Sequence, residues 1–352
     1  MLRRTKRELV HEGEWKVKEA KHLVRLMAAS VALCLLLATL GCTGGGSVEK
    51  KPAEPAWPSK DITFIVPFKA GGGYDIQARI VAPLIEKYLP RKANVIVNNQ
   101  PAAGGKVGSL ALMKSPPDGH TIGLLSPAAL GVMQVNGELE GLDIRELTWL
   151  GQVSWDAGVL VASAKSGFKR PEDLKKREVR FGVTANAYPQ AVLLANKLGL
   201  KARMVMFEGS AEEVLACMRG DIDLMINSWP TSKQMVEDSQ GSIVPLFVVA
   251  DDRVPQWNEV PSSKELGLDL KELYALEATA RVLAAPGGLA PDVRAALEDV
   301  VSKALHDPEF AANMEKAGYV PGAASAAEAR EAVAAIITVL ERNKDILQSL
   351  SK

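Results

Sequence analysis

Short apolar runs alternate with amphipathic stretches along most of this chain, a pattern typical of α/β proteins. Residues 62–66, Ile-Thr-Phe-Ile-Val, are rich in β-branched side chains and predict a strand buried on both faces of a sheet. Beyond them, Ile76, Ile80 and Leu84 recur at helical spacing, so a helix is expected to follow the strand.

The alternation continues toward the C-terminus. Runs near the end of the chain, at 291–305 and 327–347, have the spacing of amphipathic helices that pack on a sheet. Further strands are expected at residues 94–98, 121–125, 159–162, 180–183, 203–207, 224–226, 243–249 and 281–284. Strands that alternate with helices in this way indicate parallel sheets.

Two glycine-rich turns follow the first two predicted strands. Glycines 71–73 come just before the first helix, and Asp75 stands where a carboxylate can cap helix amides. Residues without a Cβ let a ligand approach the main chain, and a helix N-terminus favours an anion. Taken alone, this turn is equally compatible with a flexible connection. The second turn, residues 101–108, can converge with it at one sheet edge, where ligands of open α/β sheets bind.

Charge and motif content exclude several classes of function. The chain of 352 residues has no net charge, and residues 42–352 hold 34 basic and 38 acidic side chains, so no basic surface for nucleic acid is expected. The turns match neither the Gly-x-Gly-x-x-Gly nor the Gly-Lys-Ser/Thr fingerprint of nucleotide sites.

The N-terminal segment has the features of an export signal. Residues 27–41 are uncharged and follow a basic flank, but they are too few to span a bilayer, which needs about 20. The sequence Leu-Ala-Thr-Leu-Gly-Cys that ends at Cys42 resembles a bacterial lipobox, which implies a signal peptide over 1–41 and lipidation of Cys42. A plain cleaved signal is the alternative. Glycines and prolines in residues 42–57 predict a flexible tether.

Few residues are suited to catalysis or metal binding. Cys217 is the one thiol after Cys42, and His120 and His306 are far apart in the sequence. There is no Gly-x-Ser-x-Gly, His-Glu-x-x-His or Cys-x-x-Cys motif. We therefore predict no enzyme activity, no metal and no cofactor.

Several segments together resemble one family. Residues 66–75, 101–108, 117–121, 218–223 and 259–267 are similar, in order and spacing, to signature segments of the extracytoplasmic solute-binding receptors of tripartite tricarboxylate transporters, the Bug-type receptors. The resemblance runs from about Trp57 to the C-terminus.

This resemblance implies an α/β, two-lobed periplasmic-binding-protein fold of type II, with two sheets, flanking helices and two interlobe crossings. Lobe one would comprise residues 58–160 and 284–352, and lobe two residues 161–283. Residues 159–162 and 281–284 are apolar extended segments suited to the crossings.

The resemblance also implies a ligand carboxylate held mainly by backbone amides and water at the two glycine turns. Transferred by position, with Ser126 at the end of the third strand, the lobe-one contacts are Phe68, Ala70, Gly72, Gly73, Asp75, Ala103, Gly104, Gly105 and Ser126. The lobe-two candidates are Thr184, Asn186, Tyr188, Ser210, Asn227 and Trp229. Three have structural alternatives: Asp75 as a helix cap, and Tyr188 and Trp229 as packing aromatics. Lys69 either meets a second acidic group or is solvated.

By this resemblance the protein is a monomeric, lipid-anchored receptor outside the cytoplasm. It would capture a small organic carboxylate and deliver it to a membrane permease. A receptor that reports ligand closure to a membrane-bound signalling kinase is the alternative, because both roles need the same anchored, hinged cleft.

Overall fold

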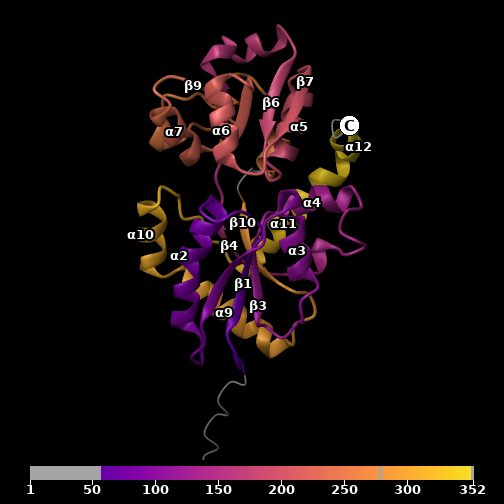
Figure 1. The fold of residues 1–352 in the computed structure, drawn as a ribbon, viewed down its shortest axis with the longest axis vertical. Coiled ribbons are helices and arrows are strands. Elements are labelled where there is room, and N and C mark those ends of the chain that lie inside the picture. Colours follow the sequence, from indigo (N-terminus) through magenta and orange to yellow (C-terminus); the bar gives the residue numbers. More distant parts are fainter. Residues whose placement is uncertain (1–56, 277–279, 350–352) are drawn as a thin grey trace, which may run out of the picture. The chain divides into compact units, whose positions relative to one another are not determined.

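The computed structural model describes residues 57–276 and 280–349, which form two β-sheets, each flanked by helices (Figure 1). The predicted signal peptide, Cys42 and most of the tether lie outside the described residues. Within residues 57–276 and 280–349, no helix combines the length and apolar character needed to cross a membrane.

The first sheet takes four of its five strands from the N-terminal half of the chain. We call this sheet and its helices lobe one. Its strand order is β2 (Val95–Asn99), β1 (Ile62–Val66), β3 (Thr121–Leu125), β10 (Arg281–Ala285) and β4 (Thr148–Ser154). β1 pairs in parallel with β2 and β3, whereas β10 runs antiparallel to both β3 and β4.

The second sheet, which defines lobe two, repeats this arrangement. Its order is β7 (Ala202–Met206), β6 (Val179–Val183), β8 (Leu224–Ser228), β5 (Gly158–Ser163) and β9 (Ile243–Val248). β6 is parallel to β7 and β8, and β5 is antiparallel to β8 and β9. The strand that enters each lobe from the other, β5 or β10, is the one that runs antiparallel. The predicted two-lobed α/β fold is confirmed, with mixed sheets.

Helices cover both faces of the lobe-one sheet. They are α2 (Gly73–Tyr88), α3 (Lys106–Met113), α4 (Pro127–Val135), α9 (Pro291–Leu305), α10 (Pro308–Lys316) and α11 (Ala326–Arg342). Because side chains alternate along a strand, Phe64 of β1 packs in the cluster with α2, α9 and α10, and its neighbour Ile65 packs in the cluster with α3, α4 and α11. Both faces of β1 are therefore buried, as the run of β-branched residues predicts.

Lobe two is covered in the same way. Its helices are α5 (Tyr188–Lys197), α6 (Ser210–Arg219), α7 (Trp229–Asp238) and the short α8 (Lys271–Tyr274). Leu160 of β5 packs in the core with α5, and Val159 and Val161 pack in the core with α6 and α7. Short 3-10 turns complete the described elements: η1 (Ala103–Gly105), η2 (Ile144–Glu146), η3 (Ala164–Ser166), η4 (Pro171–Lys175) and η5 (Pro255–Trp257).

The outward crossing between the lobes is short. Residues 155–157 alone connect β4 to β5, and Trp155 within them is 51% exposed. The return crossing leads from α8 to Arg281, the first residue of β10. A short crossing of this kind can act as a hinge, because a few residues absorb the change in backbone angles.

The C-terminal helix adds another link between the lobes. The predicted helix over 327–347 is interrupted at Asn343, whose side-chain amide donates to Glu272 of α8 at 2.7 Å. The chain resumes as α12 (Lys344–Ser349), which lies beside α5 of lobe two (Figure 1). There Leu347 is buried in the lobe-two core, and the Tyr188 hydroxyl donates to its carbonyl at 3.2 Å.

Candidate ligand-binding cleft

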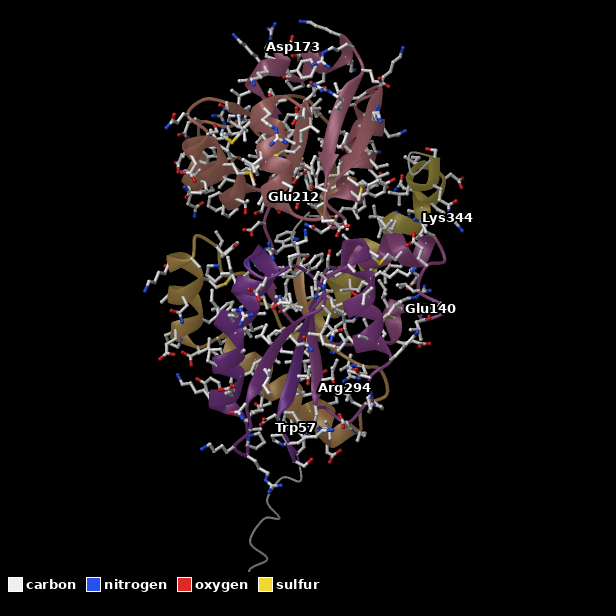
Figure 2. The ribbon with its side chains drawn as sticks, viewed as in Figure 1. Trp57, Glu140, Asp173, Glu212, Arg294 and Lys344 are labelled. Carbon is white, nitrogen blue, oxygen red and sulfur yellow. The ribbon has the colours of Figure 1, made fainter. Side chains whose placement is uncertain are left out.

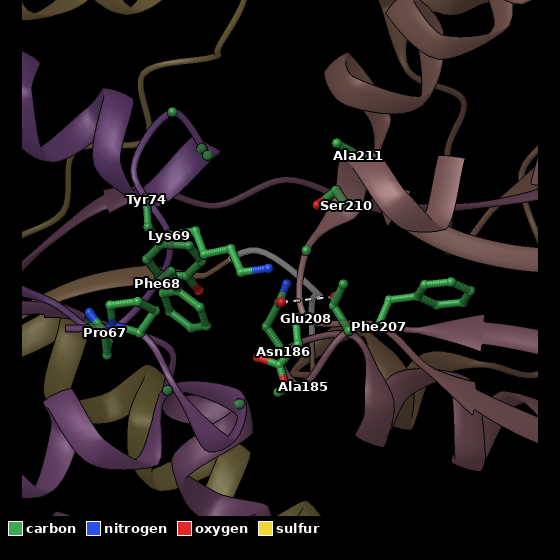
Figure 3. Close-up of a pocket in the computed structure, with 18 of the residues that line it drawn as sticks. Pro67, Phe68, Lys69, Tyr74, Ala185, Asn186, Phe207, Glu208, Ser210 and Ala211 are labelled. Carbon is green, nitrogen blue, oxygen red and sulfur yellow. Dashed lines mark hydrogen bonds between the residues drawn. The ribbon is translucent and has the colours of Figure 1, made fainter. Parts of the chain in front are cut away.

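A cleft of about 390 Å³ lies between the lobes (Figure 3). Lobe one lines it with the two glycine turns that follow β1 and β2, and lobe two lines it with the segments that follow β6, β7 and β8. All five segments leave the carboxyl ends of parallel strands, which is where ligands of open α/β sheets bind.

The first turn presents the N-terminus of α2 to the cleft. Gly71 has φ +79°, a left-handed value that favours glycine, and Gly72 is the N-cap of α2 without a side-chain cap. Asp75, in the first helical turn, accepts the Gly71 amide at 2.8 Å and the Arg79 Nε at 2.9 Å. Helix geometry leaves the first-turn amides without an intrahelical partner, so this end of α2 can receive an anion.

Asp75 stabilises the first turn in its ionised form. Burial raises the pKa of Asp75, but hydrogen bonds from the Arg79 side chain and the Gly71 amide outweigh it and leave the pKa below its ordinary value. The carboxylate is 4% exposed and is directed into the turn rather than into the cleft. Asp75 therefore holds the turn closed through the Gly71 amide, which precedes the N-cap, and it does not cap an amide of α2 itself.

The second turn packs against the first and also reaches lobe two. Gly104 and Gly105 have φ of +65° and +94°. A Cβ on Gly105 would lie 3.2 Å from the Pro67 carbonyl oxygen and 3.3 Å from the Phe68 ring, so the two turns are in close contact. A Cβ on Gly104 would lie only 2.8 Å from the Ala185 Cβ of lobe two. The absence of side chains here lets the two walls of the cleft meet.

Arg281 places a buried positive charge at the cleft, beside the first turn. Its guanidinium carbon lies 4.8 Å from the Tyr74 ring centroid and 5.6 Å from that of Tyr319, and its Nη1 donates to Ser154 Oγ at 3.1 Å. The residue is 5% exposed yet contributes to the cleft lining. Because a Cβ on Gly73 would lie 2.8 Å from Arg281 Nη2, the glycine lets the guanidinium approach the N-terminus of α2.

The exposed charges of the cleft face one another across it. Lys69 of the first turn lies 3.4 Å from Glu212 of α6, and their side chains are 55% and 60% exposed. Figure 3 shows Lys69 directed from lobe one toward the lobe-two wall, on which Glu208 also lies. An ion pair this exposed contributes little to stability. Lys69 and Glu212 are therefore accessible to a ligand.

Polar side chains form the lobe-two wall. The Thr184 hydroxyl donates to Asn186 Oδ1 at 2.9 Å, which fixes the loop after β6 (dashed line in Figure 3). Ser210 begins α6, and Asn227 lies near the end of β8, where its Nδ2 donates to Glu213 Oε2 at 3.3 Å. This wall offers hydroxyl and amide groups that can discriminate among ligands.

The structure brings most of the predicted site residues together. Those that line the cleft are Phe68, Ala70, Gly72, Gly73, Gly104, Gly105, Thr184, Asn186, Ser210 and Asn227. Those outside the lining are Asp75, Ala103, Ser126, Tyr188 and Trp229.

Each residue outside the lining has a structural reason for its position. Ala103 is exposed on η1 with φ +48°, and Ser126 caps α4 by accepting the Ala129 amide at 3.3 Å. Tyr188 points into the lobe-two core toward Leu347, and Trp229 packs beside the core with α7. Both aromatic residues therefore pack against the protein interior and do not line the cleft.

Sequence reasoning missed Arg281 and Tyr319 as cleft residues, along with Tyr74, Glu208 and Glu212. Arg281 begins an otherwise apolar strand, Arg-Val-Leu-Ala-Ala, and a lone cation at a strand end gives a weak signal. A charged residue at a strand end is expected to be exposed. Arg281 is buried because it packs against Tyr74 and Tyr319, which are distant in sequence.

Nothing in residues 57–276 and 280–349 forms a group of three or more His, Cys, Asp or Glu side chains that could hold a metal ion. Cys217, on α6, is buried as a free thiol, and burial raises its pKa to about 12. It is therefore protonated and unreactive at neutral pH.

Two sheets of matching topology, joined by crossing strands around a polar cleft, define a solute-binding protein of the periplasmic type. Residues 77–351 match the model of the "Tripartite tricarboxylate transporter family receptor", and the chain belongs to this family. The family resemblance seen in the sequence is thus confirmed. The family and its fold are those of receptors that bind substrates.

Named relatives agree with this assignment. The chain is 26% identical to the protein BugT of Bordetella pertussis over 325 residues, which cover 89% of this chain and 94% of that protein. Two solved structures have the same fold. Rpa4515 from R. palustris with adipate has a TM-score of 0.68 at 23% identity, covering 83% of this chain and 98% of that one. MatC from Rhodopseudomonas palustris with bound malate has a TM-score of 0.66 at 21% identity, and the match covers 83% of this chain and 100% of that one.

Proposed function

We propose that this protein is an extracytoplasmic receptor that captures a small organic carboxylate in the interlobe cleft and delivers it to a membrane permease of the tripartite tricarboxylate type. The carrying observation is the convergence of two glycine turns and the buried guanidinium of Arg281 at one end of the cleft. Charge-assisted hydrogen bonds from fixed amides suit a carboxylate, since they are roughly twice as strong as neutral ones.

Cleft size and the solved neighbours support a small acid. A cavity of about 390 Å³ is at the lower end of the range for small-molecule sites, roughly 300–1,000 Å³. The neighbours carry adipate and malate, both dicarboxylates. A second carboxylate would meet Lys69 or the hydroxyl groups of lobe two.

A thermal-shift screen of mono- and dicarboxylates tests this function. A ligand at 100 times its dissociation constant adds about 2.7 kcal/mol to the free energy of unfolding. We expect at least one acid of four to six carbons to raise the melting temperature, and amides of the same acids to have no effect. If no carboxylate shifted the melting temperature, the proposal would be overturned.

The division of the chain is part of the proposal. Residues 1–41 would be the signal peptide and 42–57 the tether. The sequence predicts lobe one over 58–160 and 284–352 and lobe two over 161–283. We propose that each change of lobe lies about three residues earlier, because β5 belongs to the second sheet and β10 to the first. The strand positions support a change of lobe near residues 155–157 and just before Arg281. We also propose that the receptor acts as a monomer, which light scattering after size exclusion would check.

Lipidation of Cys42 is supported by the sequence around it alone. We expect the wild-type protein to remain with the membrane fraction, with a mature N-terminus at a modified Cys42 in mass spectrometry. The Cys42→Ala variant should lose this modification and its membrane retention. A wild-type protein with an unmodified Cys42 would contradict the anchor and leave the cleft proposal intact.

A further inference from the structure

A buried carboxyl group lies directly behind the lobe-two wall of the cleft. Glu213, in the first turns of α6, is fully buried, with 0% of its surface exposed. Its Oε2 accepts the Nδ2 of Asn227 at 3.3 Å, while Oε1 has no hydrogen-bond partner among the described residues. Because Asn227 lines the cleft, this hydrogen bond connects Glu213 to the ligand-binding surface.

The surroundings of Glu213 are shaped to hold it. A Cβ on Gly182 of β6 would lie 3.4 Å from Glu213 Cγ, 3.3 Å from the Phe207 ring and 2.3 Å from Ile222 Cδ1, so a larger residue at 182 would displace this group of side chains. Ile222 and Phe207 surround the acid with apolar surface. Burial raises the pKa of Glu213 to about 8, so it is mostly protonated at neutral pH. Because Oε2 accepts the Asn227 amide, the proton belongs on Oε1.

Other charges around this acid are already paired or lie on the cleft side. Cys217, one turn further along α6, has its pKa raised by burial and by Glu213 and Asp223. Asp223, just before β8, is paired with Arg177 and Arg180 at 2.8 and 2.9 Å. On the cleft side, Glu212 lies 3.4 Å from Lys69, and Glu208 is exposed. The hydrogen bond to Asn227 is therefore the direct link from Glu213 to the cleft.

An asparagine side chain presents different chemistry on its two sides. Nδ2 is a donor and Oδ1 is an acceptor, and the hydrogen-bond network around the amide decides which side faces a ligand. With Nδ2 directed to Glu213, Oδ1 of Asn227 is the group left for the cleft, and it accepts no hydrogen bond from the described residues. At Asn227 the lobe-two wall then offers an acceptor, which repels a carboxylate and suits a donor.

We propose that Glu213 is a positioning residue that orients the Asn227 amide with its oxygen toward the cleft, so that the receptor prefers an acid whose far end carries a hydrogen-bond donor such as a hydroxyl group. This inference rests on the proposed function for the carboxylate end of the ligand. It narrows the substrate class from small carboxylates in general to hydroxy acids.

Matched acids test the preference. The probes are 6-hydroxyhexanoate, adipate and hexanoate, with 4-hydroxybutyrate, succinate and butyrate as the shorter set, measured by calorimetry. In the wild-type protein we expect the hydroxy acid of one set to bind about tenfold or more tighter than the diacid and the plain acid of the same length. A diacid that binds as tightly as the matched hydroxy acid would overturn the proposed ligand class.

Variants test the role of Glu213 itself. Glu213→Met keeps the length of the side chain but removes the acceptor, so the Asn227 amide is free to turn Nδ2 toward a ligand carboxylate in the cleft. The ratio of diacid to hydroxy-acid affinity should then change about tenfold in favour of the diacid. Glu237→Met, at an exposed position of α7 where Glu237 is paired with Lys233, is the matched control. An unchanged ratio in Glu213→Met would overturn the positioning role.

A measurement without ligand keeps the inference testable on its own. The side-chain amide signals of Asn227, assigned by their loss in Asn227→Ser, should shift with pH in the wild-type protein and stay constant in Glu213→Gln. Signals that do not titrate in the wild type would overturn the coupling. If these signals titrate but no acid binds, the coupling is supported and the proposed function fails, so the two failures are distinguishable.

Discussion

At the scale of single residues, Arg281 is a buried cation that lines the cleft, and its charge acts on the buried carboxyl group of Asp156. A guanidinium removed from water has lost hydration, and here the two tyrosine rings and the Ser154 hydroxyl replace part of it. Ser154 in turn donates to Gln77 of α2 at 2.9 Å, so the return crossing, the end of β4 and the first helix are connected. Arg281 thus supplies both charge and rigidity to the anion end of the cleft.

Replacing Arg281 should weaken carboxylate binding more than it weakens folding. We expect Arg281→Gln to reduce the affinity for an acid found in the screen by about tenfold or more, which is about 1.4 kcal/mol. The affinity of Arg281→Lys should lie between those of the wild type and Arg281→Gln, because lysine keeps the charge but loses the planar stacking on tyrosine. Calorimetry on folded variants measures this, and wild-type affinity in Arg281→Gln would contradict it.

Glu213 should make stability depend on pH in a defined direction. Its pKa in the folded protein, about 8, lies above the ordinary value of 4.5, so between these values the folded state binds more protons than the unfolded state. The free energy of unfolding should therefore fall as pH rises through this window, by about 1.4 kcal/mol per pH unit from this group. Urea unfolding of wild type and Glu213→Gln from pH 5 to pH 9 measures the difference. Parallel pH curves for the two proteins would contradict the assignment.

At the scale of elements, the two glycine turns differ in what their glycines do. Gly71 is needed for its backbone angle, Gly73 for the approach of Arg281, and Gly104 for both its angle and its contact with lobe two. The contact at Gly104 joins lobe one to the loop that contains Ala185. A side chain there acts on the geometry of the cleft as well as on the turn itself.

We expect Gly104→Val to reduce acid binding at least tenfold, because the added side chain would meet Ala185 and force the walls apart. Gly141→Val is the matched control, since Gly141 also has a left-handed φ, +83°, but has open space around its Cβ position. Both variants should lose about 1–2 kcal/mol of stability from backbone strain, as urea unfolding would show. Equal binding by the two variants would argue against a role for the contact.

Most elements could be predicted from the sequence, because the cores of both lobes are apolar runs with clear periods. The run at 62–66 is β1, and the glycine turns at its end and after β2 line the cleft. β4 had no such signal, because its buried residues Thr-Trp-Leu-Gly-Gln-Val-Ser mix polar and apolar side chains without alternation. The break at Asn343 depends on Glu272, a partner 71 positions away, which local spacing does not reveal.

Only the part of the candidate site that is formed by main-chain groups, the two glycine turns, could be predicted from the sequence. A glycine turn is visible in sequence because the residue type itself states the backbone requirement. Burial of Arg281 and the link from Glu213 to Asn227 depend on side chains brought together by the fold. Tyr188 shows the converse, since an aromatic residue next to a predicted loop is directed into the core by the C-terminal helix.

At the scale of the whole molecule, the lobes are joined by the two crossings, by α4 against α5, and by α12, which begins at Lys344 (Figure 2), against α5. A receptor that opens and closes must bend at the crossings, and α12 adds an apolar contact that limits this motion. Leu347 of α12 is fully buried in the hydrophobic cluster that α5 shares with residues of α4 and α11.

Leu347→Ala should therefore loosen the link between the lobes. We expect a loss of about 2–4 kcal/mol in the free energy of unfolding, typical for a buried leucine, and a larger radius of gyration in X-ray scattering without ligand. Leu215→Ala, at a position that is 53% exposed, should change neither quantity. A compact Leu347→Ala variant would show that α12 does not limit the motion of the lobes.

The half-exposed indole of Trp155 gives the outward crossing an optical property. Trp57, Trp149 and Trp257 are buried in the two lobes, where a dissolved quencher such as acrylamide has little access, and Trp229 is partly buried. Bending of the three-residue link changes the surroundings of Trp155, so ligand capture should alter the quenchable part of the native fluorescence, and Trp155→Phe should remove this change. Trp155 is thus an intrinsic fluorophore at the proposed hinge, and the kinetics of closure can be followed without labelling.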